Sequence, residues 1–131
     1  LLIEEARTNL ALQSQDFSTT WGATRVTIAT NSTTAPDGTS TADTIVIDGT
    51  DSTTHYPHQA VTIVSGTTYT LSVYAKAKEY TRITPLMETT GFSSNVSATF
   101  NLSTGVVDAT AGSPDATSIT DEGNGWYRCS I

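Results

Sequence analysis

Two histidines three positions apart are the first residues of this sequence whose types could do chemistry. His55 and His58 lie in the stretch HYPHQ, which has no cysteine and no frame of acidic residues around it. A zinc site needs three or four ligands at a recognisable spacing, and this non-helical stretch supplies only two. We therefore interpret both histidines as solvated loop residues and expect no metal site.

Catalysis would require a nucleophile, a base and an orienting group within hydrogen-bond reach of one another. No serine of this chain stands in a G-x-S-x-G frame. A glycosidase needs two carboxylates that face each other across a sugar, whereas most carboxylates here fall in turns. These turn carboxylates are Asp37, Asp48, Asp51, Asp121 and Glu122. We expect that the protein is not an enzyme.

The stretch SGTTYTLSVYAKA, residues 65–77, points to a different chemistry. Its residue types alternate, which is typical of a strand with one buried face. The apolar face holds Tyr69, Leu71, Val73, Ala75 and Ala77, and the polar face holds Thr70, Ser72, Tyr74 and Lys76. A sugar site combines an exposed aromatic ring, which stacks on sugar C–H groups, with planar side chains that hydrogen-bond to hydroxyls. The polar face has residue types of this kind.

We predict one ligand-binding face that gathers aromatic and polar side chains from several strands. In the last strand, Trp126 and Arg128 alternate with apolar residues and should project away from the core. The predicted members are Tyr74, Trp126, Arg128, Lys76, Arg82 and Glu88, with Tyr56 and Gln59 at the rim. Two other interpretations stay open: an ordinary solvated sheet face stabilised by cross-strand pairs, or a face covered by a neighbouring subunit.

Short strands are the elements that must position these residues. Alternating runs separated by Gly, Pro, Asp and Ser turns favour an all-β, antiparallel sandwich or barrel. The expected strands cover 24–30, 42–47, 60–64, 69–77, 82–89, 96–102, 106–107, 116–120 and 126–131. Pro85 cannot donate to a ladder, so its strand should be an edge or bulged strand. Residues 4–15 should form an irregular lead-in, and residues 31–41 a loop.

Composition and charge exclude several classes of partner. The net charge is −7, and the six Lys and Arg residues form no basic run, which argues against nucleic acid because such binding needs clustered positive charge. No apolar run approaches the roughly 18 residues needed to span a bilayer, which argues against a membrane segment. Cys129 is the only cysteine. It cannot form an internal disulfide, and we expect it to be a small buried hydrophobe.

Several motifs in a fixed order resemble a known family. Asn9-Leu10, Asp16-Phe17 and Trp21 match the opening NL…DF…W of carbohydrate-binding modules in the group that contains families 4, 9 and 22. SGTTYTLSVYAKA resembles the central strand of that group, and Asn124-Gly125-Trp126-Tyr127-Arg128 resembles its late GW strand. The sequences of these motifs most resemble the version of this domain found in tailed-phage structural and tail-fibre proteins.

This resemblance implies a jelly-roll β-sandwich with a concave sheet face, over residues 16–131 and lacking its final strand, after a lead-in over 1–15. Phe17 and Trp21 should pack beneath the lead-in. Family members often hold a structural calcium through an acidic residue after the Phe of DF; Ser18 stands there, so we expect no cofactor.

The resemblance also implies a function and a setting. The implied partner is a glycan or host-surface polysaccharide, and the implied location is the virion or the extracellular space. Two alternatives remain. The domain could be a structural decoration or assembly domain that contacts other virion subunits, with homo-oligomers among its assemblies. It could also be the accessory module of a polysaccharide-active enzyme.

Overall fold

The computed structural model describes residues 7–88 and 92–131, and in these ranges it consists of antiparallel strands and turns without a helix. The predicted all-β class is confirmed. No helix long and apolar enough to cross a membrane occurs in these two ranges. The chain divides into two compact units, Leu1–Thr62 and Ile63–Ile131.

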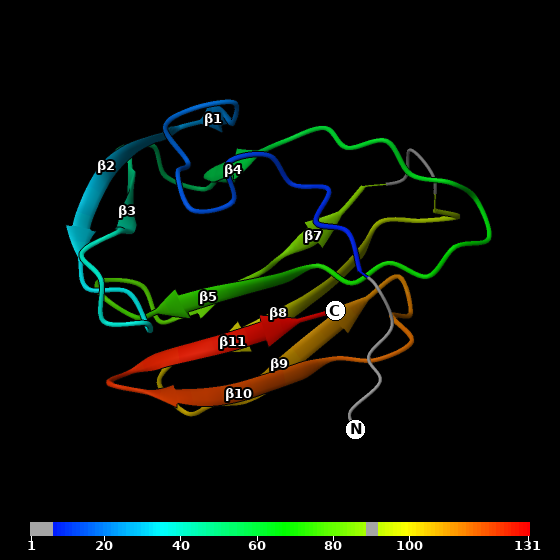
Figure 1. Ribbon diagram of the computed structural model, residues 1–131. Helices are drawn as coiled ribbons and strands as arrows, with labels where there is room; N and C mark the ends of the chain where they lie inside the picture. Colours follow the sequence, from blue (N-terminus) through cyan, green and yellow to red (C-terminus); the bar gives the residue numbers. More distant parts are fainter. Residues whose placement is uncertain (1–6, 89–91) are drawn as a thin grey trace, which may run out of the picture. The chain divides into compact units, whose positions relative to one another are not determined.

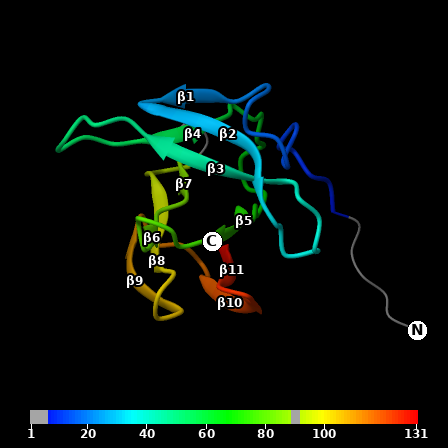
Figure 2. The ribbon, with the colours of Figure 1, turned by 90° about the vertical axis from the view of Figure 1, so that its left-hand side faces the viewer.

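The first unit contains two antiparallel pairs of strands, β1 with β4 and β2 with β3 (Figure 2). The strands are β1 (Gly22–Thr24), β2 (Val26–Thr33), β3 (Ala42–Ile47) and β4 (Tyr56–His58). The bounds of β3 are those predicted. The run over 24–30 was predicted as one strand, but it is interrupted at Arg25, whose φ of 53° is outside the range of a strand.

The lead-in folds back onto the start of the first unit. The indole N–H of Trp21 donates to the carbonyl oxygens of Leu12 (3.1 Å) and Gln13 (3.2 Å). The ring of Trp21 meets the ring of Phe17 edge-on at a centroid distance of 4.8 Å. The predicted packing beneath the lead-in is therefore confirmed for Trp21, and Phe17 packs on the ring of Trp21. Residues 7–10 have no regular structure and residues 11–15 form a bend and a turn, as predicted for an irregular lead-in; residues 4–6 of that prediction lie outside the described residues.

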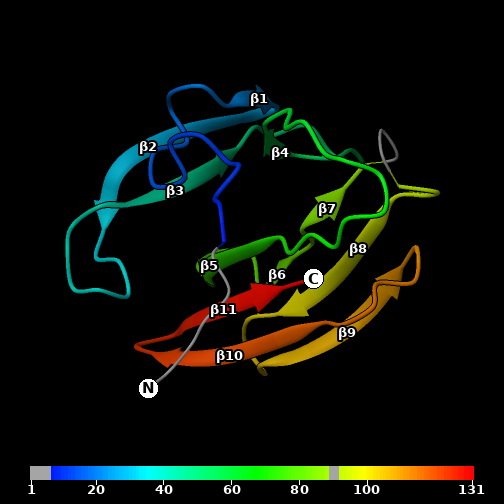
Figure 3. The same cartoon turned by 45° about the vertical axis from the view of Figure 1, so that its right-hand side comes forward.

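The second unit contains two sheets (Figure 1). One has the strand order β10-β11-β5. In the other, β8 pairs with β6 and β7 and also with β9. β9 and β10 follow each other in the chain but belong to different sheets (Figure 3). The strands are β5 (Ser72–Lys76), β6 (Arg82–Ile83), β7 (Leu86–Met87), β8 (Val96–Asn101), β9 (Val106–Ala111), β10 (Ser118–Gly123) and β11 (Trp126–Ser130).

The core of the second unit lies between these sheets, which gives it the packing of a β-sandwich. Ala98, Phe100 and Leu102 come from β8 and the residue after it, and they pack against Ala75 of β5 and Cys129 of β11. Alternation places these side chains on the inner faces of their strands.

Two further predicted strands are split or absent in the structure. The run over 82–89 is split at Thr84 and Pro85 into β6 and β7. Both strands pair only with β8 and so lie at an edge of the sheet, which agrees with the missing N–H of proline. Residue 89 lies outside the described residues. The predicted strand over 60–64 is absent from the described chain. Val61 and Val64 are exposed, which shows that alternation forms a strand only where a partner strand is available.

Burial makes the thiol of Cys129 unreactive in the folded state. The residue is fully buried, and desolvation raises the pKa of its thiol to about 11. We expect slow labelling by a thiol reagent at pH 8 in buffer and fast labelling in denaturant, because only the exposed thiolate reacts. The thiol is neutral in both states below its unfolded pKa of about 8.5. Its contribution to stability is therefore complete below that pH and is lost as the pH rises toward 11.

Candidate functional site

The register of β10, β11 and β5 builds one continuous row of polar side chains. Tyr74 of β5 pairs with Arg128 of β11, which pairs in turn with Thr120 of β10. Directly paired residues of antiparallel strands project from the same side of the sheet. Val73 and Cys129, their neighbours along the strands, pack in the core. The Tyr74 row therefore faces away from the core, as the alternation predicted.

Two further rows flank this central row. On one side of it, Ser130 of β11 pairs with Ser72 of β5 and with Ser118 of β10; on the other side, Lys76 pairs with Trp126. We use the term outer face for the residues of these rows, which are Ser72, Tyr74, Lys76, Ser118, Thr120, Trp126, Arg128 and Ser130. The members from β10, Ser118 and Thr120, were not predicted, and Ser72 was predicted on the polar face but not as a member of the ligand-binding face. Alternation marks Thr120 as outward, but only the long-range register places it beside Arg128.

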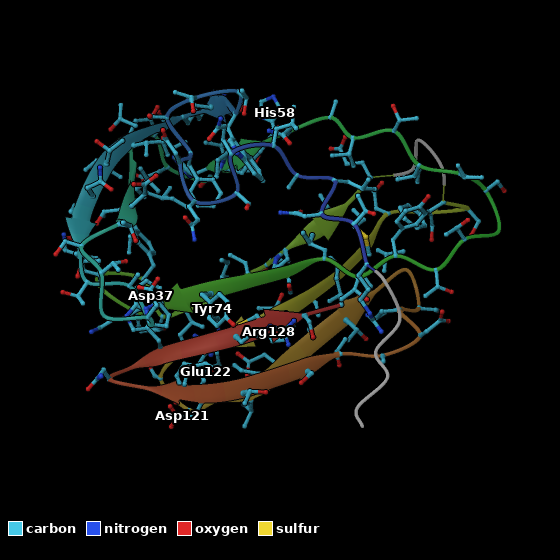
Figure 4. All side chains as sticks on the ribbon, viewed as in Figure 1. Asp37, His58, Tyr74, Asp121, Glu122 and Arg128 are labelled. Atoms are coloured by element: carbon cyan, nitrogen blue, oxygen red, sulfur yellow. The ribbon has the colours of Figure 1, made fainter. Side chains whose placement is uncertain are left out.

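The hydrogen-bond pattern brings the side chains of the central row close together. Leu71 and Ile131 exchange two backbone hydrogen bonds, both 2.9 Å long. Hydrogen-bonded and non-hydrogen-bonded pairs alternate along an antiparallel ladder, so Tyr74 and Arg128 form a non-hydrogen-bonded pair. Side chains are closest in such pairs, with Cα atoms about 4.5 Å apart. Tyr74 and Arg128 are thus immediate neighbours across the two strands, and Figure 4 labels both residues.

Tyr74 is the accessible aromatic ring of the outer face. It is 50% exposed, and both Lys76 and Arg128 are exposed beside it. Among the described residues, the only ion pairs join His55 to Asp48 and Arg82 to Asp108. Lys76 and Arg128 therefore lie next to an exposed ring without taking part in either ion pair.

The prediction that Trp126 lies exposed beside Tyr74 is wrong. Trp126 is only 8% exposed. Trp126 starts β11 directly after the turn at Asn124 and Gly125. The side chain of its partner Lys76 lies over this turn: its Cε is 3.5 Å from the position that a Cβ on Gly125 would occupy. Alternation fixes the side of the sheet from which a side chain leaves and says nothing about what covers it. The outer face thus offers one aromatic platform rather than two.

Arg82 and Glu88 do not share a face with Tyr74, contrary to the prediction. Arg82 lies on β6 of the opposite sheet, where its Nε donates to Asp108 Oδ2 at 2.6 Å. Its neighbour Ile83 packs on the core, so Arg82 projects from the far side of the sandwich. Glu88 is exposed at the end of β7 in that same opposite sheet. The prediction failed because sheet membership depends on pairing between distant strands.

Tyr56 and Gln59 belong to the first unit. The side-chain amide of Gln59 is fully engaged there: its oxygen accepts from the N–H of Leu12 (2.7 Å), and its nitrogen donates to Leu12 O (3.1 Å) and to Thr20 Oγ1 (3.1 Å). Gln59 therefore holds the lead-in in place. Tyr56 is partly exposed, and its ring contacts that of His58 at a centroid distance of 5.5 Å.

The two histidines differ in their surroundings. The side chain of His55 is 13% exposed, and its Nε2 lies 3.0 Å from Asp48 Oδ1, so its interpretation as a solvated residue is wrong. Hydrogen bonding from the backbone N–H of Thr50 is the main cause that lowers the pKa of Asp48, and His55 adds to the effect. His58 is exposed, and its ring lies against Gly22. No group of three or more metal-ligating side chains occurs among residues 7–88 and 92–131.

Comparison with known proteins does not assign a family to this arrangement. No protein-family model matches the chain, and a search of curated proteins returned no match. The candidate site therefore rests on the geometry of the outer face and on the motif resemblance.

Proposed function

We propose that this chain is a non-catalytic, carbohydrate-binding-like module with a jelly-roll fold, part of a phage structural or tail protein, and that it binds glycan through the outer face. The observation that carries the proposal is the half-exposed ring of Tyr74 directly opposite the exposed guanidinium of Arg128. The ring is a platform for sugar C–H groups. Arg128, Thr120 and the flanking serines are partners for hydroxyls.

A single aromatic platform implies weak binding at each site. An affinity on the order of 1 mM corresponds to about 4 kcal/mol of binding free energy, which one stacked ring and a few exposed hydrogen bonds would supply. Display of many copies on one virion would raise the overall avidity by a factor of about 100 to 10,000 without any new contact. A virion tail is a setting in which such weak sites are useful.

A glycan screen with a matched pair of variants tests the proposal. We expect the folded protein to bind at least one glycan, and we expect Tyr74→Ala to weaken that binding about tenfold, because stacking on an aromatic ring contributes about 1 kcal/mol or more. Tyr80→Ala is the control. Tyr80 is 61% exposed in the same unit but lies outside the outer face, so this variant should bind normally.

Two outcomes of the screen count against the proposal. One is the absence of binding to any glycan by a protein whose circular dichroism shows an intact sheet. The other is a Tyr74→Ala variant that binds as well as the Tyr80→Ala control.

Protein–protein contact within a virion is the second candidate function. The specific observation in its favour is the edge of β5. This strand ends the sheet order β10-β11-β5, and the ladder pattern turns the backbone groups of Ser72, Tyr74 and Lys76 away from β11. Unpaired edges of this kind are templates for strands of another chain. Sedimentation that changes with protein concentration, in a sample that binds no glycan, would favour this alternative.

A further inference from the structure

We infer that the glycan recognised by the outer face is acidic, with a carboxylate or sulfate group placed against Arg128 and Lys76; this inference rests on the proposed function. The chain has only six Lys and Arg residues. Two of them flank the accessible ring: Arg128 stands directly opposite Tyr74, and Lys76 lies two positions along the same strand and face. The accessible aromatic ring is thus bracketed by positive charge.

Both cations lack a carboxylate partner although carboxylates are abundant. The chain has 13 Asp and Glu residues and a net charge of −7, yet neither Lys76 nor Arg128 takes part in an ion pair among the described residues. The positions paired with Arg128 are the uncharged Tyr74 and Thr120. The two charged residues of the outer face are therefore both cations, although the protein as a whole is acidic.

The carboxylates nearest along the sheet lie at the bulge of β10. Asp121 pairs with Tyr127, which packs on the core, so Asp121 belongs to the other side of the sheet from Arg128. Glu122 is the residue at which the register of β10 and β11 shifts, and it is exposed. Figure 4 labels both residues on β10 and Arg128 on β11. Neither carboxylate forms an ion pair with Arg128 or Lys76.

The chemistry of the two cations suits an anionic sugar whose ring stacks on Tyr74. A guanidinium offers parallel N–H groups that match the two oxygens of a carboxylate or sulfate, and an ammonium adds a point charge. Lys76 lies two residues from Tyr74, a separation of about 7 Å along a strand. A sugar ring stacked on Tyr74 and the charged group of the same sugar, placed against Arg128 or Lys76, therefore fit on the outer face together. An acidic polymer is repelled by the rest of the protein, so its binding should depend strongly on these two side chains and on salt.

A matched pair of polysaccharides tests the inference. Polygalacturonate would be compared with its fully methyl-esterified form, and chondroitin sulfate with its desulfated form, at 20 mM and at about 200 mM salt, where screening is stronger. The protein is the full chain, as wild type and as Arg128→Gln, Lys76→Gln and Tyr74→Ala variants. Lys78→Gln is the control, because Lys78 is exposed just beyond β5 and is not part of the outer face.

We expect at least one acidic polymer to bind about tenfold more tightly than its neutral counterpart, with weaker binding at the higher salt. Arg128→Gln and Lys76→Gln should each remove most of this preference, and Lys78→Gln should leave it unchanged. Equal binding of acidic and neutral polymers that depends on Tyr74 but not on Arg128 would overturn the inference and keep the proposed function. An equal loss in Lys78→Gln would mean nonspecific attraction and would also overturn it. Absence of binding to every polymer would overturn both.

Discussion

Replacing Phe100 with alanine should lower the free energy of unfolding of this protein by about 3–5 kcal/mol. Phe100 is 0% exposed and lies at the centre of the sandwich core with Ala98, Leu102 and Cys129. Truncation loses the transfer free energy of the ring and leaves a cavity that the two facing sheets cannot fully close. The loss is large against a total stability of about 5–15 kcal/mol for a typical domain.

Urea denaturation followed by circular dichroism measures this loss. The Tyr80→Ala variant provides the control, since removal of an exposed ring should change the stability by less than about 0.5 kcal/mol. If Phe100→Ala cost less than the control, the core described between β8 and the β5–β11 pair would be wrong.

Replacing Gly112 with alanine should be the most damaging of the small substitutions. Gly112 follows β9 with a φ of +70°, and an added Cβ would overlap the carbonyl oxygen of Asn95. The substitution would therefore have two free-energy costs. One is the left-handed backbone conformation of a non-glycine residue, and the other is the displacement of the neighbouring strand end at Asn95. We expect a loss of about 3 kcal/mol or more from these two contributions together.

Gly66→Ala separates the two contributions. Gly66 has a similar φ of +80° but no atom within 4 Å of an added Cβ, so it should cost only the conformational part, about 1–2 kcal/mol. Thermal unfolding of both variants measures the difference. Equal losses would show that the strand end at Asn95 yields to the methyl group, and that the close approach at Gly112 is not a constraint.

The sequence pattern predicts the faces of the strands well, because alternation is a local property. The inner positions of β8 and the outward direction of Tyr74 and Arg128 follow from every second residue being apolar. Pro85 interrupts its strand for an equally local reason, its missing N–H. The packing of Trp21 beneath the lead-in was implied by the family motif rather than by the local pattern.

The rest of the candidate site depends on contacts between residues far apart in the sequence. Gln59 was predicted at the rim of a binding face, but its amide is occupied by Leu12, 47 positions away. Arg82 was grouped with Tyr74, but the strand order places it in the opposite sheet. No local pattern specifies which strands pair or what covers an outward ring, which is why the burial of Trp126 was also missed.

Chemical-shift mapping of the amide signals, during titration with an acidic oligosaccharide, most directly tests whether the outer face binds glycan. We expect the largest changes at Ser72, Tyr74 and Lys76 of β5 and at Arg128 of β11, and we expect these changes to disappear in the Tyr74→Ala variant. Changes centred on Arg82 and Asp108, or on residues of the first unit such as Tyr56, would contradict it.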